Sequence, residues 1–271
     1  AQQGNNTVQR FLVETFATYD PAIGEGVELS VTAGGGIQWN RSELQFMHGE
    51  GFANEQFRYP GNAGKITDYR GRPTAHNLVS AFSRGNLALR DRYFLTASIR
   101  ADGSSRFGEN NRYGIFPAVS VGWMLTDEPF MQPVARMGEL KIRVSYGVTG
   151  NQGINDNFAT LPRFGKANYA DEPGLAPSAI GNPSLKWETT RELDVGFDLG
   201  ILGGRVSLIG DYYRKKTDDL LVFRPITGTS GFTNFWSNVG NIENTGYELA
   251  LSSAWLTSRD SRAPTWATEV N

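Results

Sequence analysis

The sequence contains no cysteine and has only two histidines, His48 and His76. Disulfide bonds and thiolate metal sites are therefore excluded, and we expect neither a metal site nor a cofactor. No apolar run approaches the roughly 18 residues that suggest a membrane-spanning helix. The formal net charge of −2 gives no reason to expect nucleic acid as a partner. These absences leave a chain of 271 residues that is rich in glycine and aromatic residues.

Strand signals dominate what is present. Segments rich in Val, Ile, Leu, Thr and aromatic residues are bounded by turn residues, a pattern that predicts strands. The predicted strands are Val8–Tyr19, Val27–Asn40, His76–Leu89, Tyr93–Asp102, Tyr113–Leu125, Leu140–Val148, Leu185–Leu199, Arg205–Lys215, Gly240–Trp255 and Pro264–Asn271. A helical period is not evident beyond a short turn near Asp127–Met137. The glycine run at Thr32–Ile37 precedes no helix, so we expect a close backbone approach or a bend within a strand.

Most of these strands alternate between apolar and polar residues. Ile142, Val144 and Tyr146, for example, share one face, and Lys141 and Arg143 share the other. A soluble antiparallel sheet with one wet face gives this pattern, and so does a membrane barrel with lipid outside and water inside. A mean hydropathy of −0.38 fits both, because the two faces of a barrel strand average out.

Three features favour the barrel. Several predicted strands have about ten residues or more, the length that a tilted strand needs to cross a bilayer. Aromatic residues lie near strand ends on the apolar face, as in membrane-interface girdles, and they are Tyr93, Trp123, Tyr146 and Trp255. Short links alternate with long connections. The short ones are Asp20–Glu25, Arg90–Asp91, Gly200–Gly204 and Thr257–Ala263, and the long ones are Glu43–Thr74, Asn151–Ser184 and Thr217–Val239.

Five blocks in order resemble the TonB-linked outer-membrane transporters of the SusC/RagA type. The first is LTASIRADGSSRFGENNRYGIFPAVSVGWML, and the second is LKIRVSYGVTGNQGI. They are followed by NPSLKWETTRELDVGFDLGIL, GDYYRKKTDDLL and NVGNIENTGYELALS. The resemblance covers roughly residues 82–252.

The resemblance implies an all-β fold, an antiparallel up-and-down transmembrane β-barrel segment. About ten strands would belong to a larger barrel of roughly 22 strands. Residues 1–271 would be part of the barrel domain, and the plug domain and TonB box would not be among them. The hairpin loop Arg100–Arg112 and the connections Asn151–Ser184 and Thr217–Val239 would face the outside of the cell. The tight turns at Arg90–Asp91 and Gly200–Gly204 would face the periplasm.

Charged residues on the polar faces form the first group of candidate site residues. They would line the lumen, where they could pair across neighbouring strands and hold the plug, or simply solvate a wet interior. They are Arg100, Asp102, Lys141, Arg143, Glu192, Asp194, Asp198, Arg205, Asp211 and Glu248. No carboxylate lies in a recognisable hydrolase motif, so we do not expect an enzyme.

The long connections supply the second group, the candidate ligand-binding residues. Within GTSGFTNFWSN these are Phe232, Asn234, Phe235 and Trp236, and within GNQGINDN they are Asn151, Gln152 and Asn155. Aromatic faces stack on sugar C–H surfaces and amides bond hydroxyl groups, so the mixture suits a glycan. It suits a peptide or a partner protein equally well, and loop packing or turn formation explains it too.

The resemblance implies an outer-membrane active transporter, in a multi-pass barrel surrounded by lipid and lipopolysaccharide. It would import oligosaccharides or peptides with a SusD-like surface lipoprotein, and the TonB complex would energise it through the plug. Three alternatives stay open: a siderophore-type TonB-dependent receptor, a passive porin, and a soluble β-rich carbohydrate-binding or adhesion module.

Overall fold

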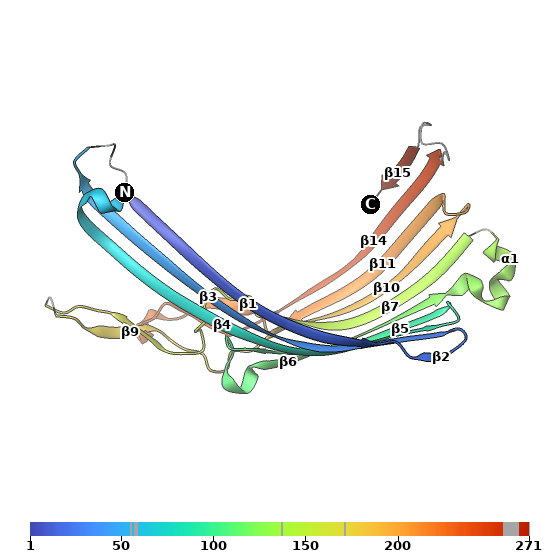
Figure 1. Ribbon diagram of the computed structural model, residues 1–271, viewed down its shortest axis with the longest axis horizontal. Coiled ribbons are helices and arrows are strands. Elements are labelled where there is room, and N and C mark those ends of the chain that lie inside the picture. The colour runs from blue at the N-terminus through green and yellow to red at the C-terminus, as the bar shows by residue number, and fades with distance from the viewer. Residues whose placement is uncertain (55, 57–58, 137, 171, 257–265, 271) are drawn as a thin grey trace.

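The protein folds into one curved layer of antiparallel strands (Figure 1). The computed structural model describes residues 1–54, 56, 59–136, 138–170, 172–256 and 266–270. In these ranges the main sheet has 11 strands in the order β1-β3-β4-β5-β6-β7-β10-β11-β14-β15, with β2 paired to β3. The main strands pair in chain order, with only β2 and the short hairpin strands β8, β9, β12 and β13 intervening in the sequence, which is the up-and-down arrangement that the sequence predicts.

The main strands are long. Their bounds are β1 Gln2–Tyr19, β2 Ala22–Gly24, β3 Val27–Phe52, β4 Ala63–Leu89, β5 Tyr93–Ser104, β6 Tyr113–Met124, β7 Gly138–Asn151, β10 Glu188–Ile201, β11 Val206–Asp218, β14 Asn241–Leu256 and β15 Trp266–Val270. Two separate hairpins lie in the long connections, β8 (Arg163–Lys166) with β9 (Leu175–Ala179) and β12 (Leu221–Pro225) with β13 (Asn234–Asn238). The helical pieces are η1 Pro60–Asn62, η2 Glu109–Asn111, η3 Leu125–Asp127, η4 Pro129–Met131, η5 Gly228–Ser230 and α1 Gln132–Ala135. In the described residues, no helix has both the length and the apolar character needed to cross a membrane.

The connections divide between two edges of the sheet, as predicted. We call the edge with the tight links the turn edge; it holds Arg90, Asp91 and Leu202, which adopt left-handed backbone conformations. The helical piece between β6 and β7 also lies there and confirms the short turn expected near residues 127–136. The opposite edge, the loop edge, holds the connections 105–112, 152–187 and 219–240. The predicted link Thr257–Ala263 and the ends of the strand predicted at Pro264–Asn271 lie outside the described residues.

One predicted connection is wrong. Glu43–Thr74 is not a long loop, because β3 continues to Phe52 and β4 begins at Ala63, with Glu43 opposite Pro73 and Phe46 opposite Arg70. This extension of β3 and β4, paired with the start of β1, is called the wing below. Its outward-facing residues Arg41, Glu43 and Gln45 are polar, so the apolar alternation of a membrane strand is missing and the pattern that finds the other strands does not find it.

The alternation of the strands becomes continuous rows across the sheet. One apolar row crosses eight strands through Leu29, Leu87, Leu95, Val121, Val144, Val195, Tyr212 and Tyr247. The adjacent polar row runs through Ser30, Asn86, Thr96, Ser120, Ser145, Asp194, Tyr213 and Gly246. No second protein layer covers the apolar face among the described residues: Val144 is 41% exposed, Val121 is 50% and Tyr247 is 80%. An uncovered apolar face of this extent requires lipid or another apolar partner.

The glycine run at Thr32–Ile37 lies inside β3, as expected. A Cβ atom on Gly34 would lie 2.7 Å from Phe16 Cβ and 2.9 Å from Phe82 Cζ. A Cβ atom on Gly36 would lie 3.0 Å from Glu14 Cγ. The glycines therefore make room for large side chains of β1 and β4 on the polar face, which explains why those two strands alternate less cleanly in sequence.

Candidate functional site

The connections at the loop edge share a small hydrophobic core. Trp187 lies at its centre, with ring centroids 5.0 Å from Phe107 and 5.4 Å from Phe116. The buried residues of this core are Phe107, Phe116, Ile154, Ala159, Leu185 and Trp187. Leu185 is predicted as a strand residue, but β10 begins only at Glu188. Leu185 instead lies fully buried in this core, which fastens the loops to the sheet.

Backbone contacts lock the 105–112 connection against the segment before β10. The Gly108 amide donates to the Leu185 carbonyl at 3.1 Å, and the Trp187 indole Nε1 donates to the Arg112 carbonyl at 2.9 Å. A Cβ atom on residue 108 would lie 1.7 Å from the Pro183 carbonyl oxygen, so only glycine fits. Two of the sequence blocks that carry the family resemblance are thus joined at this contact.

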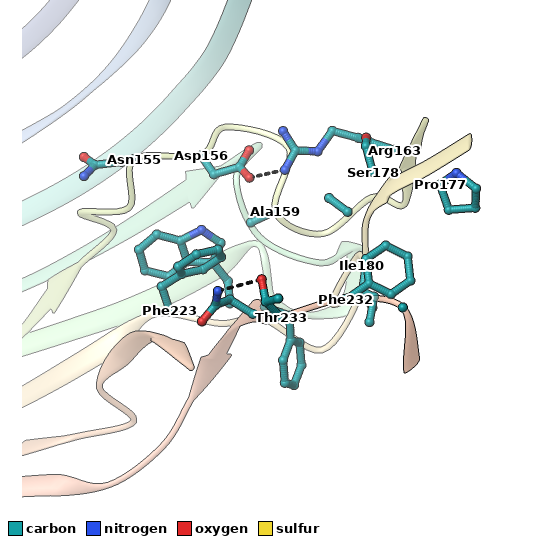
Figure 2. A pocket seen from close by; sticks show the side chains of 15 residues that line it. Asn155, Asp156, Ala159, Arg163, Pro177, Ser178, Ile180, Phe223, Phe232 and Thr233 are labelled. Atoms are coloured by element: carbon teal, nitrogen blue, oxygen red, sulfur yellow. Dashed lines mark hydrogen bonds and ion pairs between the residues drawn. The ribbon is translucent and has the colours of Figure 1, made fainter. Parts of the chain in front are cut away.

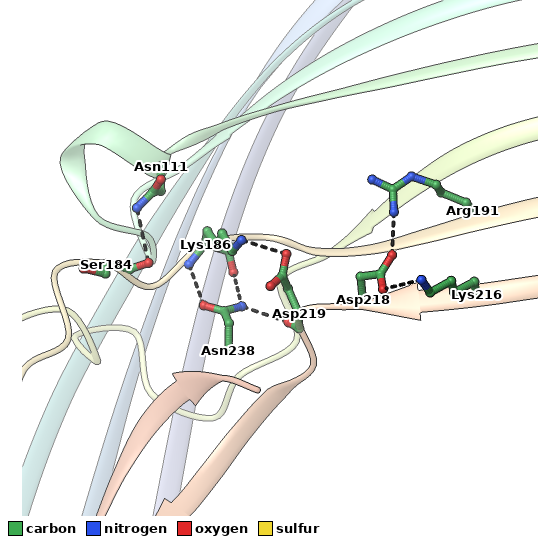
Figure 3. Close-up of polar contacts among 8 residues, drawn as sticks. All are labelled: Asn111, Ser184, Lys186, Arg191, Lys216, Asp218, Asp219 and Asn238. Atoms are coloured by element: carbon green, nitrogen blue, oxygen red, sulfur yellow. Dashed lines mark hydrogen bonds and ion pairs between the residues drawn. The ribbon is translucent and has the colours of Figure 1, made fainter. Parts of the chain in front are cut away.

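A second set of contacts fastens the start of β10 to the β12–β13 hairpin (Figure 3). The Lys186 amide donates to Asn238 Oδ1 at 3.0 Å. Asn238 Nδ2 donates in turn to the carbonyls of Lys186 and Asp219, both at 2.9 Å. Lys186 Nζ also lies 2.7 Å from the Asp219 carboxylate, and Asn111 donates to the Ser184 carbonyl at 3.2 Å. The loops therefore form one connected assembly.

A half-buried arginine holds the other side of this assembly. Arg106 Nε donates to Asn157 Oδ1 at 2.7 Å, and NH1 donates to the Gln152 carbonyl at 3.1 Å. NH2 lies 3.3 Å from His76 Nδ1. Because a guanidinium group only donates, Nδ1 must accept and His76 is neutral. Burial, together with the guanidinium groups of Arg106 and Arg10, lowers the pKa of His76 to about 4.

A pocket of about 620 Å³ opens between the β8–β9 and β12–β13 hairpins (Figure 2). Its aromatic walls come from β12, β13 and the turn between them, namely Phe223, Phe232, Phe235 and Trp236. The rings of Phe223 and Trp236 are 5.3 Å apart and tilted by 44°, and the Arg224 guanidinium lies 5.0 Å from the Phe235 ring centroid. Polar groups face them from the other side: Asn155, Asp156, Arg163 and Ser178. Asp156 and Arg163 form an ion pair.

The structure brings five of the seven predicted ligand-binding residues to this pocket: Phe232, Asn234, Phe235, Trp236 and Asn155. The other two hold the loop. Asn151 donates to Glu188 Oε1 at 3.0 Å, and Gln152 Oε1 accepts from the Ser104 hydroxyl at 2.5 Å. Asp156, Arg163 and Phe223 are lining residues that the sequence does not reveal. Asp156 lies in the connection before β8, and Arg163 and Phe223 lie in short hairpin strands without clear alternation.

Charged residues of β7, β10 and β11 gather on the polar face of the sheet. Arg143 donates through Nε and NH2 to the Asp198 carboxylate at 3.0 Å each, and NH2 also reaches Asp211 Oδ1 at 2.9 Å. Gly196 lies between these side chains in the sheet, and a Cβ atom there would be 1.9 Å from Asp211 Oδ1. Glycine at this position therefore lets one arginine bridge two aspartates on different strands.

The remaining predicted lumen residues differ in their surroundings. Lys141 Nζ lies 5.0 Å from the Phe94 ring centroid, and Arg100 Nε lies 2.8 Å from Asp102 Oδ2. Glu248 is directly opposite Asp211 on β14. Asp194 lies one row along the same face, opposite Ser145. Glu192 lies 3.9 Å from the ammonium group of Lys215. Arg205 belongs to the turn before β11 rather than to the wall, because β11 begins at Val206.

Aromatic residues at the turn edge are fixed by a carboxylate. The rings of Tyr93 and Trp123 stack with centroids 6.5 Å apart. The Tyr93 hydroxyl donates to Glu128 Oε1 at 2.5 Å, and the Trp123 indole donates to the same oxygen at 3.1 Å. These two hydrogen bonds, that of Tyr93 first, lower the pKa of the Glu128 carboxyl. Two aromatic rings of the apolar face are thus held in place at the turn edge.

Comparison with known proteins identifies this architecture. The family model described as TonB dependent receptor-like, beta-barrel, matches residues 2–268. The chain belongs to this family. TonB-dependent receptor barrels lie in the bacterial outer membrane, so the uncovered apolar rows face lipid.

Curated relatives agree with this membership. The chain is 35% identical over 98% of its length to TonB-dependent receptor P39 of Formosa agariphila. It is 37% identical over 80% of its length to TonB-dependent receptor SusC of Bacteroides thetaiotaomicron. These alignments cover 26% and 23% of the two relatives, so the chain spans about a quarter of their length.

Solved structures give the same result. The RagAB peptide transporter superposes with a TM-score of 0.86 at 27% identity, covering 95% of this chain and 29% of that one. The siderophore receptor PirA from Pseudomonas aeruginosa superposes with a TM-score of 0.57 at 14% identity, covering 97% of this chain and 42% of that one. The receptor barrel fold is thus shared with both, and the similarity to RagAB is much the greater.

Proposed function

We propose that this chain forms part of the wall and outer loops of an outer-membrane importer of the SusC type, which takes up oligosaccharides or peptides. The apolar row from Leu29 to Tyr247 carries the proposal, because it makes the sheet a lipid-facing wall with a polar inner face. The loop-edge pocket supports it further, since its aromatic and amide lining suits such substrates.

In the whole protein, a SusD-like lipoprotein would deliver substrate at the loop edge. A plug domain would close the lumen and connect the barrel to the TonB complex. The charged polar face would line that lumen, and it includes the ion pairs of Arg143 with Asp198 and Asp211. No enzymatic step is proposed. Family membership argues against a passive porin and a soluble module, and the lower similarity to PirA gives no support to a siderophore.

Uptake by the whole protein tests this function. The full-length gene would be deleted, and the cells would be grown on separate neutral oligosaccharides and on oligopeptides as the only nutrient. We expect the deletion strain to lose growth on one of these groups of nutrients. The wild-type gene should restore growth, and a protonophore should abolish the restored uptake. Phe232→Ala should reduce uptake about five- to tenfold by removing an aromatic contact, at an unchanged level in the membrane. Unaltered growth of the deletion strain on every nutrient would contradict the proposal.

A further inference from the structure

Positively charged side chains gather on the lipid-facing side of β10 and β11. Arg191 lies four residues from Val195 of the apolar row, and Arg214 and Lys216 lie two and four residues from Tyr212. Because strand residues at even spacing share a face, all three cations belong to the face of the apolar row. The lipid-facing positions of the described strands β5, β6 and β7 carry no Lys or Arg. The three residues are called the outer basic cluster below.

The outer basic cluster begins where the apolar band ends. On β10 the lipid-facing band covers Leu193–Ile201, a span of nine residues that matches the length of about 9–11 residues with which a strand crosses a bilayer. The rings of Tyr212 and Tyr247, 5.1 Å apart, mark the limit of this band towards the loop edge. At about 3.3 Å per residue, Arg214 lies about 7 Å further along β11 than Tyr212. The cations therefore lie at the level of lipid head groups, beyond the acyl chains.

Two carboxylates hold the cations in place without neutralising all of them. Asp218 Oδ2 accepts from Arg191 NH1 at 2.5 Å, and Asp218 Oδ1 lies 3.4 Å from Lys216 Nζ (Figure 3). Glu243 Oε1 accepts from Arg214 Nε at 2.6 Å. Three cations thus face two carboxylates, and the group keeps a net positive charge.

The arginines keep donors for a further acceptor. A guanidinium group has five N–H donors. Among the described residues, Arg191 donates only to Asp218, and Arg214 donates only to Glu243. The three cationic side chains are roughly half exposed on the outer surface of the wall. Exposed ion pairs of this kind contribute little to stability, so a more highly charged acceptor can share the cations with the carboxylates.

A phosphorylated lipid matches what this surface offers. Guanidinium groups bind phosphate oxygens through two parallel N–H donors, and an ammonium group binds phosphate as a point charge. On the bilayer side, Leu193, Tyr212 and Tyr247 offer an apolar and aromatic surface that suits acyl chains. A lipid with a phosphorylated head would contact both surfaces at once. Lipopolysaccharide in the outer leaflet of a bacterial outer membrane has this chemistry, because its lipid A part carries phosphates and acyl chains on sugar units.

We propose that the outer basic cluster binds the phosphorylated sugar head of lipid A. The phosphate contacts Arg214 and Lys216, with Arg191 beside them, and the acyl chains lie on Tyr212 and Tyr247. The inference goes beyond the import function and does not depend on the imported substrate. It rests on the place of the family in the outer membrane and on a loop edge that faces outwards.

Lipid binding by the purified full-length protein tests this proposal. The protein would be stripped of lipid, and its binding of diphosphoryl lipid A would be measured by native mass spectrometry. EDTA would be present, so that no divalent cation joins phosphate to the carboxylates. We expect diphosphoryl lipid A to bind about tenfold more tightly than enzymatically dephosphorylated lipid A. Excess inorganic phosphate should not displace the bound lipid.

Substitutions on one strand locate the site. Arg214→Gln combined with Lys216→Gln should weaken binding of diphosphoryl lipid A about tenfold, because charge-assisted contacts are lost. Lys215→Gln is the matched control and should bind as the wild type does. Lys215 lies between the two cations in the chain, but its side chain is on the lumen face, 3.9 Å from Glu192. Glu243→Gln should strengthen binding, since it removes a carboxylate that competes with phosphate for Arg214. Heat-modifiable migration in gel electrophoresis would confirm that each variant is folded.

Other results would overturn the site. Equal binding of phosphorylated and dephosphorylated lipid A would show that only the acyl chains are recognised. An equal loss in Lys215→Gln and in the double variant would show that overall charge, rather than this cluster, attracts the lipid. Displacement by inorganic phosphate would mean that the cluster binds phosphate without regard to the lipid. Absence of lipid A binding would reject the site, and a protein that copurifies with the wild type but not with the double variant would then assign the cluster to a protein interface.

Discussion

Two kinds of single residue shape this protein: glycines that leave room for a neighbouring group, and a histidine that stays uncharged beside an arginine. Gly108 and Gly196 are placed where a Cβ atom would overlap a carbonyl and a carboxylate oxygen. Neither position stands out in sequence, whereas the run Gly34–Gly36 does. At the loop edge the neutral ring of His76 lies beside the Arg106 guanidinium.

We predict that the loop assembly loosens as the pH falls from about 6.5 towards 4. His76 has its pKa lowered to about 4 in the folded protein, against an ordinary value near 6.5. The unfolded chain therefore binds the proton first, and stability present above pH 6.5 is lost on acidification. Hydrogen exchange of residues 104–107 and 152–157, corrected for its intrinsic pH dependence, would show protection that falls between pH 7 and pH 5.

The variant His76→Asn provides the control for this prediction. Its amide oxygen can accept from Arg106 but cannot be protonated in this range. Protection in the variant should vary less with pH than in the wild-type protein. If both proteins lost protection equally, a group other than His76 would be responsible.

At the level of the strand, the assigned faces predict the cost of a buried charge. Val144 and Val195 lie opposite each other in the apolar row, and Ser145 lies on the polar face. Val144→Arg or Val195→Arg should lower the free energy of unfolding of the full-length barrel by about 2–4 kcal/mol if these residues lie at mid-bilayer. Ser145→Arg should cost much less. Denaturant titrations of the protein in lipid vesicles would measure all three.

Val144 and Ser145 are well matched for this comparison. They are adjacent, so their local backbone and depth in the membrane are nearly the same. The difference in unfolding free energy between the two arginine variants therefore reports which face of the sheet each side chain occupies. Equal tolerance of arginine at all three positions would mean that the apolar row does not face lipid.

The same elements show how far sequence can lead. Strands β5 and β7 alternate cleanly because lipid and water constrain opposite faces, and their positions follow from the pattern. The wing escapes prediction because polar residues such as Arg41 and Glu43 occupy the face that is apolar in the other strands, so no apolar period appears. Only part of the pocket can be predicted. Phe232 and Trp236 stand out as aromatic residues in a loop, but Arg163 and Phe223 reach the pocket only because the two hairpins lie next to each other. Such contacts between distant segments leave no local signal.

The described part of the chain is a curved wall, with tight turns at one edge and a packed loop assembly at the other (Figure 1). Strands that cross the bilayer must place these edges in different aqueous compartments. The sequence has no cysteine, so a single introduced thiol reports the position of its own edge. Glu25 lies in an exposed turn between β2 and β3, and Thr229 is exposed in η5.

We predict opposite labelling of these two positions by a maleimide that does not cross membranes. Thr229→Cys in the full-length protein should react in intact cells, because the loop edge faces outwards in an importer that takes substrate from outside. Glu25→Cys should react only after the outer membrane is permeabilised. The unsubstituted protein gives the background from any thiol elsewhere in the full chain. Reaction of both positions in intact cells would place the two edges on one side of the membrane, which a spanning wall does not allow.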